Sequence, residues 1–245
     1  MATTTQNPNL VGNHPVESEN VIIPADGVEL KAYLARPSGV ADAPGVVVIH
    51  ENKGLAPYLK DVADGLASAG YLALAPDLLS RIGGTERFGD PAKEIPPKIM
   101  GLPKNQVDSD ARVTLNWVRS QRGVSRVGIV GFCWGGGVCW RMATSYPDLK
   151  AAVPFYGPNP SLDQVPNIKA AVFAIYGELD ERINVGVGPI TEALQKANIT
   201  HQKKVYPWVG HAFHNHYNPP GRYNAETAKQ AWSDAIAWLD QHLKG

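Results

Sequence analysis

Five uninterrupted apolar runs constrain the fold of this chain most strongly, and the intervals between them leave room for helices. The runs cover residues 45–49, 71–75, 127–130, 151–155 and 171–176. A strand buried on both faces needs apolar side chains at every position, whereas a strand with one face in water alternates apolar and polar residues. The runs therefore predict a mostly parallel central sheet with helices on both faces, which is an α/β fold.

The segments around these runs show the expected companion patterns. Apolar residues recur at every third or fourth position over 59–69, 107–119, 138–146, 190–197 and 225–243, which predicts helices, while residues 202–206 predict a further strand. Before the first run, residues 21–23 and 28–35 flank the turn sequence Ala25-Asp26-Gly27. That arrangement predicts an N-terminal antiparallel hairpin at the edge of the sheet.

The chain of 245 residues suits one large domain. We predict an arm over residues 1–18, rich in Thr, Asn, Pro and Glu, followed by a single domain over residues 19–245. Within that domain, residues 78–105 contain two adjacent glycines and four prolines and show no sustained period. A long irregular stretch inside an α/β domain is typical of a pocket cover, so we predict that role for residues 78–105.

The charge balance and the apolar runs exclude several classes of partner. The 23 Lys and Arg residues equal the 23 Asp and Glu residues, so we expect no nucleic-acid partner. No apolar run approaches the roughly 18 residues that a membrane-spanning helix needs. The first fifteen residues also lack the pattern of a secretion signal. We expect a cytoplasmic monomer or small homo-oligomer, or a periplasmic one if a signal was removed.

The sequence Gly131-Phe132-Cys133-Trp134-Gly135 places a nucleophile-type side chain between a predicted buried strand and a predicted helix. The glycines permit a tight turn that exposes Cys133 at the carboxyl end of the strand, where the amides of the following helix favour a thiolate and an oxyanion. Other interpretations are a buried core cysteine or a phosphate-binding turn, but the G-x-G-x-x-G and Gly-Lys-Ser/Thr patterns are absent. Cys139, six residues on, is interpreted as a core residue, and a disulfide between the two would have poor geometry.

A thiol nucleophile needs a base and an acid that orients the base, and the chain offers both in the order used by α/β-hydrolases. Asp180 follows the run 171–176, and His211 follows the strand predicted over 202–206. Since the carboxyl ends of parallel strands share one edge, we expect Cys133, Asp180 and His211 to converge. Other candidates stay open, and they are Glu178 and Glu181 for the acid and His201, His214 and His216 for the base.

Two further features concern the surroundings of the nucleophile. Backbone amides after the first parallel strand and after the nucleophile form the oxyanion hole in such folds, which indicates Asn52 and Trp134 here. His211, His214 and His216 could alternatively supply a metal site, although the pattern matches neither the H-E-x-x-H helix nor a Cys/His finger. A metal-dependent hydrolase and a binding protein without catalysis therefore remain alternatives to a thiol hydrolase.

The set of motifs resembles the dienelactone hydrolase family, also called carboxymethylenebutenolidase-like proteins. The matching pieces span about residues 20–243, and they are His50-Glu51, Ala75-Pro76-Asp77-Leu78 with Arg81, Gly131 to Gly136, Tyr176 to Asp180, Gly210-His211-Ala212-Phe213 and the last helix. The resemblance implies an α/β-hydrolase fold, a small ester or lactone substrate and a triad of Cys133, Asp180 and His211. It implies no metal or organic cofactor.

The resemblance also assigns roles outside the triad. Glu51 would contact the resting thiol of Cys133, and Arg81 would bind a carboxylate of the substrate. The family has a second arginine four residues after the catalytic histidine, where this chain has Asn215. Because one cationic, bidentate donor is missing, the doubly charged lactone of the name-giving enzymes is in doubt as a substrate, while hydrolysis is not.

Overall fold

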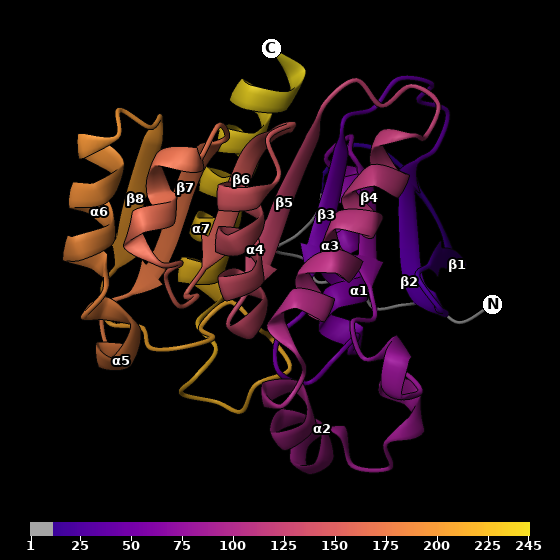
Figure 1. Ribbon diagram of the computed structural model, residues 1–245, viewed down its shortest axis with the longest axis horizontal. Coiled ribbons are helices and arrows are strands. Elements are labelled where there is room, and N and C mark those ends of the chain that lie inside the picture. Colours follow the sequence, from indigo (N-terminus) through magenta and orange to yellow (C-terminus); the bar gives the residue numbers. More distant parts are fainter. Residues whose placement is uncertain (1–11) are drawn as a thin grey trace.

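A computed structural model describes residues 12–245 and shows a single eight-stranded sheet, in the order β1-β2-β4-β3-β5-β6-β7-β8 (Figure 1). The strands are β1 (Val16–Ala25), β2 (Val28–Pro37), β3 (Gly45–Ile49), β4 (Leu72–Pro76), β5 (Val127–Phe132), β6 (Leu149–Phe155), β7 (Ala171–Gly177) and β8 (His201–Tyr206). β1 and β2 are antiparallel, β2 also pairs antiparallel with β4, and the other pairs are parallel. The predicted sheet with its antiparallel hairpin at one edge is confirmed.

Helices cover both faces of the sheet and bury two separate apolar cores. One core contains side chains of α1 (Pro57–Ser68) and α7 (Ala225–Leu239), and the other contains those of α3 (Lys104–Arg119), α4 (Trp134–Ser145) and α6 (Val187–Lys196). Figure 1 shows α3, α4 and α6 in front of the strands and α7 behind them. β3 and β5 are buried at every position, as strands covered on both faces must be.

The N-terminal hairpin is longer than the sequence indicated. The strands expected over residues 21–23 and 28–35 extend to β1 and β2, whose register runs from Ala25 opposite Val28 to Val16 opposite Pro37. β1 is an edge strand, so one side of it faces water and polar residues can continue it. The strand therefore extends beyond the point at which apolar and polar residues stop alternating. Of the arm predicted over residues 1–18, residues 1–11 lie outside the described part of the chain, and residues 16–18 belong to β1.

The prediction that residues 78–105 are irregular is wrong. They contain the short turns Ser80–Ile82 and Thr85–Arg87, the helix α2 (Pro91–Met100) and the start of α3. Asp90 caps α2 by accepting a hydrogen bond from the amide of Lys93. The helix therefore forms although it contains Pro96 and Pro97. Ile95 and Ile99, one turn apart, are buried in a cluster that also packs against Trp134. This segment therefore lies against the turn that carries Cys133.

Two further expectations concern the cysteines and the membrane. Cys133 and Cys139 are both free thiols, in line with the poor geometry expected for a disulfide between them. Cys139 is buried in the core on α4, where burial raises the pKa of its thiol. Among residues 12–245, no helix combines the length and the apolar character needed to cross a bilayer.

The short helix α5 (Glu181–Asn184) follows β7, and the chain ends in a wide helical turn over Asp240–Lys244 that continues α7. The turn buries Leu243 in the core beneath the sheet. The loops that follow β3, β5, β7 and β8 all leave the carboxyl edge of the sheet because these strands are parallel. That edge collects the residues of the candidate site.

Candidate active site

Cys133 lies in the sharp turn between β5 and α4, with a φ of 55° and a ψ of −117°. Such a backbone conformation costs on the order of 1–3 kcal/mol and recurs at functional sites. A Cβ on Gly131 would lie 2.1 Å from the carbonyl oxygen of Gly135, and one on Gly135 would lie 2.4 Å from that of His50. Both positions therefore require glycine because backbone segments meet there. The turn leaves Cys133 partly exposed at the carboxyl edge.

The structure brings Cys133, His211 and Asp180 into one hydrogen-bonded chain. His211 Nε2 lies 3.0 Å from the Sγ of Cys133, and His211 Nδ1 lies 2.5 Å from the Oδ2 of Asp180. The three residues come from loops after three different strands, as the sequence prediction requires. This is the geometry of a nucleophile, a base and an orienting acid.

The environment of His211 favours its protonated form. Burial alone would lower the pKa of the imidazole, but its hydrogen bonds with Asp180 and Cys133 outweigh burial and raise the pKa to about 9. Asp180 is 6% exposed and directly precedes α5, and its carboxylate lies against the imidazole of His211. An imidazolium beside the thiol stabilises a thiolate, which is the reactive form of cysteine.

The competing acids and histidines have other partners. Glu178 accepts a hydrogen bond from the amide of Trp208 at 2.9 Å, and Glu181 is an exposed first residue of α5. His201 begins β8, so it lies at the opposite end of that strand from the site, and its Nδ1 contacts the carbonyl of Ile199. None of these three side chains takes part in the chain formed by Cys133, His211 and Asp180.

The three histidines of the metal alternative face three different partners. His211 lies between Cys133 and Asp180, whereas the Nδ1 of His214 contacts the hydroxyl of Tyr58 at 2.7 Å. The Nε2 of His216 lies 3.1 Å from Asp61. His214 is completely buried, and burial lowers the pKa of its imidazole to about 3. Within residues 12–245, no group of three or more His, Cys, Asp and Glu side chains is arranged to hold a metal ion.

Asn52 and Trp134 lie in the segments that follow two neighbouring strands, β3 and β5, at the carboxyl edge of the sheet. Trp134 is the first residue of α4, where an amide has no acceptor within the helix. Asn52 follows β3, whose last residue Ile49 pairs with Gly131 of the neighbouring strand β5. His50 orders this region because its ring stacks on that of Trp134 at 5.4 Å and its Nε2 accepts from the amide of Leu78.

Glu51 is buried at the site with a different set of partners from the one the resemblance implies. Its Oε2 accepts a hydrogen bond from the Nδ2 of Asn215 at 2.6 Å, and its Oε1 accepts one from the hydroxyl of Tyr156 at 3.4 Å. Burial raises the pKa of Glu51, although Asn215 and Lys53 act in the opposite direction. The hydrogen-bond partner of the Cys133 thiol is His211 instead.

Tyr156 is a residue of the site that the sequence reasoning missed. It directly follows β6, is fully buried and has a φ of 38°, a strained value for a residue with a side chain. Its ring lies 5.1 Å from that of His211, and its hydroxyl contacts Glu51. The available signal was its position immediately after a buried strand, the same relation that identified Asp180.

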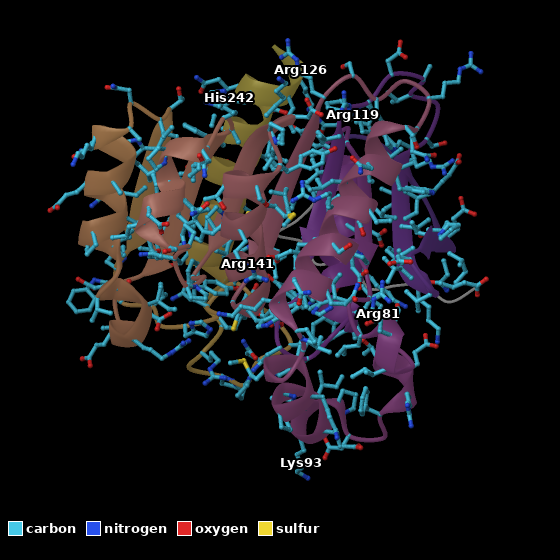
Figure 2. All side chains as sticks on the ribbon, viewed as in Figure 1. Arg81, Lys93, Arg119, Arg126, Arg141 and His242 are labelled. Atoms are coloured by element: carbon cyan, nitrogen blue, oxygen red, sulfur yellow. The ribbon has the colours of Figure 1, made fainter. Side chains whose placement is uncertain are left out.

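Arg81 is engaged in a bidentate ion pair within the protein. Its Nε and Nη2 each lie 2.9 Å from the carboxylate of Asp110, and its Nη1 donates to the carbonyl of Asp26. Asp110 is 2% exposed, so this pair compensates a buried charge. Figure 2 shows Arg81 among the N-terminal elements, coloured purple. Binding of a substrate carboxylate by Arg81 stays a prediction.

Three comparisons with known proteins bear on this geometry. The family model of the dienelactone hydrolase family matches residues 30–243. A protein of Yersinia pestis provisionally named carboxymethylenebutenolidase is 33% identical over 94% of this chain and 90% of its own length. A protein of Escherichia coli O157:H7 with the same provisional name is 36% identical over 90% of this chain and 85% of its own.

Solved structures agree with the sequence comparisons. A crystal structure from Klebsiella pneumoniae subsp. pneumoniae MGH 78578, provisionally named dienelactone hydrolase, superposes with a TM-score of 0.83 and 33% identity over 93% of this chain and 99% of that chain. An acylaminoacyl peptidase of Pyrococcus horikoshii, at 14% identity and a TM-score of 0.74, covers 95% of this chain with 42% of its own, which shows the fold alone. From the family model and these relatives, we conclude that the chain belongs to the dienelactone hydrolase family and is a carboxylic ester hydrolase with an α/β-hydrolase fold.

Proposed function

We propose that the protein hydrolyses small carboxyl esters or lactones by acyl transfer to Cys133, with His211 as the base and Asp180 as the acid that orients it. The observation that supports this most directly is the continuous chain from the Sγ of Cys133 through His211 to Asp180, with distances of 3.0 and 2.5 Å. The proposed cycle needs neither a metal nor an organic cofactor.

In the acylation step, the thiolate of Cys133 attacks the carbonyl carbon, and the carbonyl oxygen becomes an oxyanion. The amides of Asn52 and Trp134 are the proposed donors to that oxyanion. The tetrahedral intermediate then expels the alkoxide or enolate, which receives the proton that His211 took from the thiol. A thioester on Cys133 remains, and in a lactone the leaving oxygen stays attached to the acyl chain.

In the deacylation step, His211 takes a proton from water, and the resulting hydroxide attacks the thioester. The thiolate leaves, recovers its proton from His211, and the acid product departs. Asp180 stays ionised throughout and stabilises the imidazolium that forms twice in the cycle. Because a thiolate is a better leaving group than an amide nitrogen, the mechanism suits activated esters and enol lactones better than peptides.

The thioester intermediate gives the direct test. Rapid acid quenching during turnover of p-nitrophenyl acetate should trap a protein whose mass has increased by one acetyl group, with peptide mapping placing the acetyl group on Cys133. The same quench should yield no acetylated Cys133 peptide once the substrate is exhausted. Steady hydrolysis with no acetylated Cys133 at any quench time, or incorporation of the acetyl group at another residue, would contradict acyl transfer to Cys133.

Replacement of Arg81 tests the carboxylate specificity that the resemblance implies. Because Asp110 would lose its bidentate partner, we expect Arg81→Ala to lower the free energy of unfolding by about 2–3 kcal/mol. If Arg81 serves only to pair with Asp110, kcat/KM should change to the same extent for a lactone with a carboxylate and for a neutral aryl ester. Denaturant unfolding and paired kinetics measure both effects. A loss confined to the anionic lactone would instead support carboxylate binding by Arg81.

A further inference from the structure

The side chain of Asn215 joins two loops of the site. Asn215 lies four residues after His211 and is 4% exposed. Its Nδ2 donates to the Oε2 of Glu51 at 2.6 Å, and its Oδ1 accepts from the amide of Tyr217 at 2.9 Å. Both ends of the amide are therefore used, one by the loop after β3 and the other by the loop that carries His211.

Glu51 is the group that this amide holds. Its side chain is buried, and its second oxygen faces the hydroxyl of Tyr156, which adjoins the ring of His211. The charged and titratable groups around Glu51 are Lys53 on its own loop, Tyr58 on α1, Tyr156 after β6, and His211 beside the thiol of Cys133. A carboxylate in this enclosed setting affects the ionisation of whichever group it faces.

We propose that Asn215 is a positioning residue that holds the Glu51 carboxyl against Tyr156 and so leaves the Cys133 thiol to His211. A carboxylate that turned toward the thiol would oppose its ionisation, because two negative charges would then share a site with little water. This inference rests on the proposed function, since it concerns the thiol that would act as nucleophile. It assigns Asn215 a role through Glu51 and no contact with the substrate.

The hydrogen-bonding pattern at Asn215 requires a donor and an acceptor on one short side chain. Leucine supplies neither, so it would leave the Oε2 of Glu51 without its donor. Aspartate can still accept from the amide of Tyr217, but it can donate to Glu51 only while one carboxyl of the pair is protonated. Asn215→Asp therefore preserves the contact at low pH and replaces it with repulsion between two carboxylates at high pH.

The test is the rate at which iodoacetamide alkylates Cys133 in Asn215→Asp and in the unmodified protein between pH 5 and pH 9. We expect similar rates at the acidic end and a rate at least about tenfold lower in the variant at the alkaline end, the size of one lost hydrogen bond to a charged group. Peptide mapping assigns the alkylated residue, with Cys133→Ala as the blank. A ratio of rates that does not change with pH would overturn the proposal, because a purely structural defect acts at every pH.

A swapped pair and a neighbouring asparagine make the test specific. In the double variant Glu51→Gln/Asn215→Asp the amide and the carboxylate exchange places, so the hydrogen bond is restored and the alkaline loss should largely disappear. Asn218→Asp adds a carboxylate to the same loop, where Asn218 donates to the carbonyl of Ala212, and should not reproduce the pH-dependent ratio. If Asn218→Asp reproduces that ratio, or the swap recovers nothing, the Glu51 contact is not the cause.

The outcome can be separated from the proposed function. Alkylation reports on the thiol itself and needs no substrate, so the role of Asn215 can fail while acetyl transfer to Cys133 stands. Conversely, absence of the acetyl intermediate would remove Cys133 as nucleophile without changing the alkylation result. If Asn215→Asp does not fold, the double variant Glu51→Gln/Asn215→Asp still tests the proposal. Its rate of Cys133 alkylation should depend on pH as that of the unmodified protein does, and a different pH dependence would overturn the proposal.

Discussion

Replacing Cys133 with alanine should give a folded protein whose kcat/KM for a small aryl ester is lower by several orders of magnitude. The side chain is partly exposed at the turn after β5, so its removal creates no core cavity. Loss of a triad nucleophile has cost a factor of up to about 10⁶ in kcat in a well-studied protease, which sets the upper range. Initial rates and circular dichroism together measure the effect.

Cys139→Ala is the matched control for this change. Cys139 is the second cysteine of the chain, lies on α4 and is buried in the core on the face opposite α7. Its removal should cost about 1 kcal/mol of stability through a small cavity and leave kcat/KM within a few-fold of the original value. Turnover by Cys133→Ala close to the unmodified rate would rule out the thiol mechanism.

Replacing Asp180 with asparagine should lower kcat by about three to four orders of magnitude, the effect that loss of a triad carboxylate produces when the geometry is kept. The asparagine can no longer stabilise the protonated imidazole, while burial of His211 still opposes protonation. The pKa of His211 should therefore fall from about 9. Alkylation of Cys133 at neutral pH should slow as well, because less of the thiolate is paired with imidazolium.

The same change alters how stability depends on pH. The pKa of His211 in the folded protein, about 9, lies above its usual 6.5. The contribution of the protonated imidazole to the free energy of unfolding is therefore fully present below pH 6.5 and is lost as the pH rises through 9. In Asp180→Asn that dependence between pH 6.5 and 9 should weaken, which denaturant unfolding at several pH values measures. Glu178→Gln changes an exposed neighbouring acid and should alter neither the activity nor the pH dependence of stability. If Glu178→Gln lowered kcat as much as Asp180→Asn does, Asp180 would not be the orienting acid.

The sequence determined the parts of this protein that depend on repeating local patterns. Buried strands need continuous apolar runs, so runs such as that of β5 predicted strands covered on both faces and hence a mostly parallel sheet. The order of Cys133, Asp180 and His211 along the chain, each after a strand, also indicated which edge they share. The glycines beside Cys133 were informative because only glycine fits where backbone segments approach within van der Waals distance.

Local sequence patterns predicted secondary structure less well where an element faces water or depends on a helix cap. The polar outer residues of β1 hid the length of the hairpin, and Pro96 and Pro97 hid α2, which Asp90 and two buried isoleucines stabilise. The pairing of β1 and the capping of α2 depend on hydrogen bonds, which leave a weaker trace in composition than apolar burial does.

Only the tertiary structure decided which polar side chains meet. Glu51 and Asn215 are 164 positions apart, and Arg81 and Asp110 are 29 apart, yet each pair forms short hydrogen bonds. The chain has 23 Lys and Arg residues, and the sequence gives no preference among them as the partner of Asp110. A buried carboxyl needs some partner, but which partner it obtains depends on how loops from distant strands pack at one edge of the sheet, and no local pattern encodes that packing.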